Sequence, residues 1–163
     1  MNAPPSDQRG LTLTEVTIVA AIGVIVLLGM AAFYLESQGT WLDASNQAIT
    51  QREASFITQT IADSVRSCAK AVVSPSATDP HATLTLYKHS DLVNPAYCFW
   101  WGSDGHVHAG PDPTSGDLGP MTESQADTFR ALTDPTHVQV WLTLRAATGQ
   151  RVSMTTSAVL MNR

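Results

Sequence analysis

The chain has 163 residues, of which 44% are hydrophobic and 14% are charged, and its formal net charge is −5. This length allows one modest domain beside a membrane segment and excludes a two-domain enzyme. The hydrophobic fraction excludes global disorder, and the acidic balance predicts no general affinity for nucleic acid or anionic lipid surfaces.

The N-terminus combines a polar leader with an apolar stretch. Residues 1–10 form the leader, which contains two prolines and a single basic residue, Arg9. Residues 11–35 form the apolar stretch, in which Glu15 is the only charge. As a helix at about 1.5 Å per residue, this stretch can cross a hydrocarbon core of about 30 Å. The basic leader and the acidic residues after the span favour a cytoplasmic N-terminus.

A secretory signal peptide cut near Met30 and a plain single-span anchor are the alternative interpretations of this stretch. Apolar regions of secretory signal peptides run to about 15 residues, so this one is too long. Glu15 argues against both alternatives, because a carboxylate inside a membrane helix costs about 3 kcal/mol and usually has a nearby partner. Cleavage after Gly10 would create such a partner, the α-amino group of Leu11, one helical turn from Glu15.

The residues RGLTLTE at positions 9–15 lead into the unbroken apolar stretch. This arrangement resembles the class III signal of type IV pilins and type II secretion pseudopilins. The resemblance implies that a prepilin peptidase cuts after Gly10 and methylates Leu11, and that Glu15 guides docking of the subunit in a filament. It also implies an inner-membrane precursor with a periplasmic C-terminal domain. The implied partners are other filament subunits, the peptidase and the membrane assembly platform.

Residues 36–73 keep a helical periodicity and are expected to form an amphipathic helix that continues into the globular domain. The members of its apolar stripe are Ile57, Ile61, Val65, Cys68 and Val72. We expect this stripe to pack on a sheet and the polar residues of the opposite face to be solvated. The proline-containing segment 74–80 closes the helix.

Over residues 74–163 the periodicity changes to 2, which predicts an antiparallel β-sheet. The expected strands are residues 83–88, 96–101, 105–109, 137–145 and 152–160, and a short helix is expected over residues 123–132. The predicted fold class is α+β, with a long N-terminal helix packed on a C-terminal antiparallel β-sheet. The first half of that helix is transmembrane and the second half is amphipathic. This order of elements is similar to minor subunits of the J class in type II secretion and the W class in type IV pili.

The two cysteines of the chain, Cys68 and Cys98, fall on the translocated side of the predicted span. A disulfide there would join the helix to the sheet and stabilise the fold by about 3 to 4 kcal/mol. We expect this disulfide, with two buried free thiols as the alternative. The spacing of the cysteines matches neither a zinc site nor a redox pair.

His106 and His108 stand two residues apart and would project from one face of a strand. No spacing fixes a further ligand beside them, so we expect two exposed histidines and no metal site. Asp104, Asp112 and Asp117 lie in or beside loops, but they lack the ligand spacing of a calcium loop.

Trp100, Trp101 and Trp141 are more typical of a sheet core or of subunit contacts than of a ligand platform. No nucleophile elbow, phosphate loop, HExxH helix or cofactor motif occurs, so we expect no catalytic activity and no cofactor. The sequence predicts a minor pilin or pseudopilin that is assembled into a type IV pilus or a type II secretion pseudopilus. The alternative is a single-span periplasmic sensor or enzyme whose anchor stays uncleaved.

Overall fold

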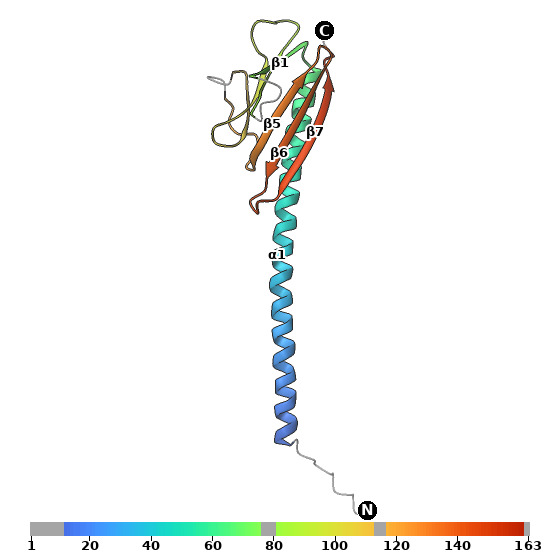
Figure 1. Ribbon diagram of the computed structural model, residues 1–163, viewed down its shortest axis with the longest axis vertical. Helices are drawn as coiled ribbons and strands as arrows, with labels where there is room; N and C mark the ends of the chain where they lie inside the picture. The colour runs from blue at the N-terminus through green and yellow to red at the C-terminus, as the bar shows by residue number, and fades with distance from the viewer. Residues whose placement is uncertain (1–11, 76–80, 113–116, 162–163) are drawn as a thin grey trace, which may run out of the picture. The chain divides into compact units, whose positions relative to one another are not determined.

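A computed structural model describes residues 12–75, 81–112 and 117–161. The chain divides into an N-terminal unit, residues 1–42, and a C-terminal unit, residues 43–163. Helix α1 (Leu13–Arg66) supplies the described structure of the N-terminal unit and the first element of the C-terminal unit (Figure 1). The long helix followed by antiparallel strands confirms the predicted α+β fold class.

Helix α1 ends at Arg66, so the prediction of a helix to residue 73 was wrong at its end. The residues Lys70–Ser74 form strand β1, which pairs with the next strand along its whole length. The backbone N–H of Ala69 already donates to the carbonyl of Tyr87 at 2.8 Å, so pairing with the sheet takes over directly after the helix. Val72, the last member of the predicted stripe, is therefore a strand residue and stays 38% exposed.

In the described residues the strands form two antiparallel sheets, where the sequence predicted one. The first sheet has the order β1–β2–β3–β4 and the second has the order β5–β6–β7. The strands of the first sheet after β1 are β2 (Thr83–Tyr87), β3 (Tyr97–Trp101) and β4 (Val107–Gly110). The strands of the second sheet are β5 (Gln125–Thr133), β6 (His137–Arg145) and β7 (Arg151–Val159).

Strand β5 joins the two sheets. The backbone N–H of Ala82, just before β2, donates to the carbonyl of Phe129 at 2.9 Å. The indole N–H of Trp101 on β3 donates to the carbonyl of Ala126 at 2.9 Å. Both acceptors belong to β5, so this strand links the two sheets, although no continuous ladder connects them among the described residues.

One hydrophobic core lies between helix α1 and the inner faces of both sheets. Strand β6 shows the underlying pattern most clearly, because every second residue from Val138 to Leu144 is buried and the residues between them are not. The largest fully buried side chains of the helix belong to the same core and are Ile57, Ile61 and Val65. The apolar stripe of the helix thus packs on the sheets, as the sequence predicted.

Strand β5 replaces the short helix predicted over residues 123–132. Ala126 pairs with Leu144 and Thr128 pairs with Thr143, so Asp127 is an extra residue without a partner in the ladder. This bulge shifts the alternation by one residue. Ala126 and Phe129 consequently both face the core, and their spacing of three residues resembles a helical pattern.

Candidate functional site

Thr12 and Glu15 form a capping box at the start of helix α1. The backbone N–H and the hydroxyl of Thr12 donate to Glu15 Oε2 at 2.9 and 3.0 Å. The backbone N–H of Glu15 donates back to Thr12 Oγ1 at 3.3 Å. These reciprocal bonds satisfy backbone groups that have no partner inside the helix. The T-x-x-E spacing is a sequence signal for this cap, but only a docking role was predicted for Glu15.

The other two predicted site residues of this segment, Gly10 and Leu11, lie outside the described residues. Their predicted roles in cleavage and methylation therefore rest on the sequence. Glu15 itself is exposed and lies at the first turn of the helix, directly after the predicted cleavage point.

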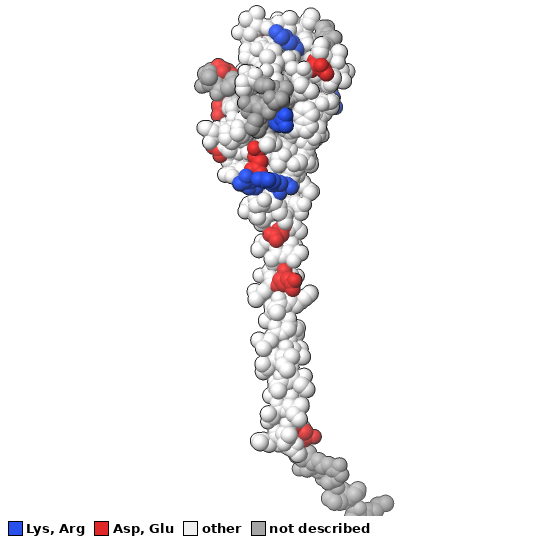
Figure 2. Space-filling view, viewed as in Figure 1, with Lys and Arg blue, Asp and Glu red and all other residues white. Residues whose placement is uncertain are grey.

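The N-terminal part of helix α1 presents an apolar surface that the chain itself does not cover. Its most apolar window of 18 residues has a mean hydropathy of 2.7, and none of that window is buried within the described structure. Side chains such as Ile25, Leu28 and Leu35 are 66–69% exposed. On the face shown in the space-filling view, the helix carries no charged atoms between the acidic patch at its start and the next one farther along it (Figure 2). A helix that is apolar on all sides needs a bilayer or other helices around it, and this one is long enough to span a membrane.

The predicted disulfide is absent, because Cys68 and Cys98 are both free and buried. Cys68 belongs to the core between the helix and the sheets. On β3, Phe99 faces that core, so its neighbour Cys98 points to the opposite face, where its Sγ donates to the Pro111 carbonyl at 3.4 Å. The sheet therefore separates the two thiols, and burial raises the pKa of both.

His108 is buried between two carboxylates, so the prediction of an exposed histidine was wrong at this position. Its Nδ1 lies 3.0 Å from Asp117 and its Nε2 lies 3.0 Å from Asp104. The ring also stacks on Trp100, with centroids 5.7 Å apart. Burial disfavours the charged imidazole, but the hydrogen bonds to Asp117 and Asp104 outweigh it and raise the pKa of His108. We call His108, Asp104 and Asp117 the imidazolium clamp.

The clamp does not have the geometry of a metal site. The two carboxylates approach opposite nitrogens of one ring, so they cannot converge on a single ion. His106 precedes strand β4, and its Nδ1 lies 3.2 Å from the Ser124 carbonyl oxygen. Within the described ranges, no group of three or more His, Cys, Asp or Glu side chains is arranged to hold a metal.

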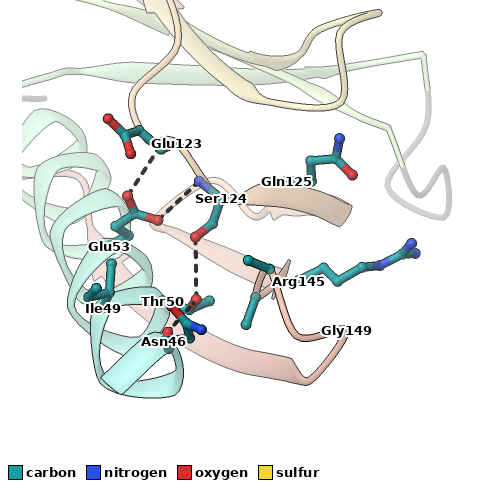
Figure 3. A pocket seen from close by; sticks show the side chains of 11 residues that line it. Asn46, Ile49, Thr50, Glu53, Glu123, Ser124, Gln125, Arg145 and Gly149 are labelled. Atoms are coloured by element: carbon teal, nitrogen blue, oxygen red, sulfur yellow. Dashed lines mark hydrogen bonds between the residues drawn. The ribbon is translucent and has the colours of Figure 1, made fainter. Parts of the chain in front are cut away.

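A carboxylate on helix α1 holds the segment that leads into β5. Glu53 accepts hydrogen bonds from the backbone N–H groups of Glu123 and Ser124 at 3.2 and 3.1 Å. The hydroxyls of Thr50 and Ser124 lie 3.3 Å apart beside them (Figure 3). These contacts border a groove of 490 Å³ that Ile49 and the turn around Gly149 also line. The role of Glu53 could not be predicted from the sequence, because nothing in its local pattern reveals a partner 70 residues away.

Comparison with known proteins adds one finding. The family model of the prokaryotic N-terminal methylation motif matches residues 5–31. No curated protein and no solved structure matches the chain. The matched segment contains Gly10, Leu11 and Glu15, the residues from which the sequence predicted a class III signal. The chain therefore carries the prokaryotic N-terminal methylation motif, the class III signal peptide that is typical of type IV pilins and pseudopilins.

Proposed function

We propose that the protein is a minor pilin or pseudopilin, a structural subunit without catalytic activity. It is synthesised as an inner-membrane precursor with a cytoplasmic N-terminus and a periplasmic C-terminal unit. A prepilin peptidase cuts it after Gly10 and methylates Leu11. The mature subunit then joins a type IV pilus or a type II secretion pseudopilus through helix α1.

One observation carries the proposal: the methylation motif leads directly into a helix whose apolar surface is entirely unburied. A permanent membrane anchor needs such a surface only for contact with lipid. A filament subunit uses it twice, because the bilayer that covers the helix before assembly is replaced by the helices of neighbouring subunits.

Glu15 links cleavage to docking in this proposal. In the precursor, the Glu15 carboxylate accepts hydrogen bonds from Thr12 of its own chain. Cleavage after Gly10 adds a new amino group at Leu11, within reach of Glu15 of the same chain or of a neighbour. A charge pair of this kind lowers the cost of keeping a carboxylate in an apolar surrounding, and it fixes the register between helices.

The intact mass of the protein tests the processing step. In cells that contain a prepilin peptidase, we expect the mass to correspond to residues 11–163 with one added methyl group. In cells without the peptidase, and in a Gly10→Val variant, we expect the full precursor. A full-length mass in both strains would instead favour the single-span sensor or enzyme with an uncleaved anchor.

A Glu15→Ala variant tests the docking step. We expect normal cleavage but a loss of about tenfold or more in the amount recovered from sheared filaments, because a paired carboxylate is replaced by a methyl group. Glu36→Ala is the matched control, since it removes an exposed glutamate from the same helix beyond the matched motif. Equal incorporation of the two variants would refute the docking role of Glu15.

A further inference from the structure

The outer face of the β5–β6–β7 sheet, turned away from the core, carries a shallow groove of 530 Å³. The register places Arg130, Trp141 and Thr155 in one row across the three strands. Residues directly opposite each other on neighbouring strands have Cβ atoms about 5 Å apart. The next row consists of Thr128, Thr143 and Ser153, so the groove joins one indole and one guanidinium to a band of hydroxyl groups.

The indole and the guanidinium of this groove are both available to a ligand. Trp141 is half-buried and alternates with the core residues Val140 and Leu142, so it lies on the outer face. In the part of the chain that the structure describes, neither the Trp141 N–H nor the Arg130 side chain has a hydrogen-bond or ion-pair partner. An exposed aromatic surface beside a few polar groups that fix orientation is typical of ligand sites.

The charge of this face is opposite to that of the whole chain. Arg130, Arg145 and Arg151 lie on it with one carboxylate, Asp127, which gives a local net charge of 3 − 1 = +2 against −5 for the chain. Asp127 pairs with Arg145 and, at 2.6 Å, with Arg151. Arg130 is thus the one guanidinium of these three that is not engaged by a carboxylate among the described residues.

We propose that this face binds an acidic polysaccharide, a polymer whose sugar rings carry carboxylate groups. A sugar ring lies on the apolar surface of the Trp141 indole, and its carboxylate accepts paired hydrogen bonds from Arg130. The hydroxyls of Thr143, Ser153 and Thr155 exchange hydrogen bonds with the sugar hydroxyls along the groove. Binding at this face depends on neither processing nor filament assembly, so it goes beyond the proposed function.

The same observations disfavour nucleic acid as the ligand. A nucleic acid strand carries one phosphate per nucleotide, and proteins that bind it usually provide several free cations and several stacking side chains. This groove offers one unpaired guanidinium and one indole, and its other lining residues carry either hydroxyls or apolar side chains. A single stacking surface beside a band of hydroxyl groups fits a polymer with several hydroxyls on each sugar ring, which single-stranded DNA lacks.

Binding to alginate, a polymer of carboxylated sugars, tests the proposal. The full chain is solubilised in a detergent without a sugar head group, and titration calorimetry is run with alginate, neutral dextran and a single-stranded oligonucleotide. We expect saturable binding of alginate alone. Trp141→Ala and Arg130→Gln should each weaken it by about tenfold, the size expected for a lost stacking or charged contact.

Two controls separate lost binding from lost folding. Arg66→Gln removes an exposed arginine elsewhere and should leave alginate binding unchanged. Trp141→Phe keeps an aromatic ring on the face and should retain most of the binding, even if Trp141→Ala fails to fold. The proposal is overturned if alginate does not bind, if dextran binds as well, if Arg130→Gln has no effect, or if the oligonucleotide binds more tightly.

Discussion

The imidazolium clamp shows how a few side chains can fix two loops on a sheet. A Cβ atom at Gly102 would lie 2.5 Å from Asp104 Oδ1 and from the His108 ring, so only glycine leaves room for this approach. On the other side, Asp117 Oδ1 accepts the backbone N–H of Gly119 at 2.8 Å while the same carboxylate contacts His108. Both loops are therefore held by one buried ring, which donates to both carboxylates when it is protonated.

This charge predicts a specific pH dependence of stability. The pKa of His108 is raised, so the stabilisation it gives is complete below about pH 6.5 and is lost as the pH rises through the folded-state pKa. Burial opposes ionisation of Asp104, but its contacts with His108 and with the His106 backbone outweigh burial and lower its pKa. The pKa of Asp117 is also lowered, mainly by its hydrogen bond to His108. Their contribution is present above about pH 4 and is lost as the pH falls further. The clamp therefore stabilises the fold most between about pH 4 and about pH 6.5.

We expect Asp117→Asn to lower the melting temperature clearly at about pH 5.5 and much less at a pH above the folded-state pKa of His108, where the ring is neutral in both proteins. Thermal unfolding of the full chain in detergent, followed by circular dichroism, measures the difference. Asp63→Asn is the control, because its exposed ion pair with Arg66 contains no histidine. An equal effect of Asp117→Asn at both pH values would contradict the clamp.

At the level of single residues, the sequence could predict the N-terminal methylation motif but not the clamp. Arg9, Gly10 and Glu15 belong to one continuous segment, so the motif can be recognised directly from their spacing. Asp104 precedes β4 in the chain and Asp117 follows it, and both contact His108 only in the folded structure. No local sequence pattern predicts these contacts.

At the level of elements, the predictions succeeded where one periodicity runs unbroken. Strand β6 alternates over its whole length and was predicted with its correct ends, His137 and Arg145. The bulge at Asp127 breaks that alternation in β5, and the sequence therefore suggested a helix. Strand β1 was missed for another reason: its residues continue the apolar spacing of the helix, and only pairing with β2 distinguishes the two structures.

The apolar stripe of helix α1 leads to a prediction about the core. Ile61 is fully buried between the helix and the sheets, so Ile61→Ala should lower the free energy of unfolding by about 2 to 5 kcal/mol. Gln59→Ala, on the exposed side of the same turn, should change it by no more than about 0.5 kcal/mol. Urea unfolding followed by tryptophan fluorescence compares the two variants. Similar losses in both would mean that the stripe does not anchor the helix.

At the level of the whole molecule, the division into two units separates the hydrophobic core from the exposed apolar surface. Every member of the described hydrophobic core lies in the C-terminal unit, from Ala54 to Leu160. The described residues of the N-terminal unit contribute an exposed apolar helix and no buried side chain. The C-terminal unit thus contains the contacts needed for a fold, and the N-terminal unit contains the surface needed for lipid or for neighbours.

We therefore expect a fragment of residues 43–163 to fold alone and to stay soluble without detergent. Its thermal unfolding should be cooperative, because removal of residues 1–42 takes away no member of the core. Circular dichroism in the near and far ultraviolet, recorded during heating, checks this outcome. A fragment with secondary structure but no cooperative transition would show that the N-terminal unit contributes to the fold.

The two unbonded thiols also bear on how the protein reaches its compartment. Since neither Cys68 nor Cys98 is cross-linked, the C-terminal unit can complete its fold in a reducing cytosol as readily as in an oxidising periplasm. If the unit is exported as proposed, oxidation therefore cannot act as the signal that delays its folding until export. Under the proposed topology, the chain must cross the membrane before its hydrophobic core forms, or a chaperone must keep the chain unfolded until it has crossed.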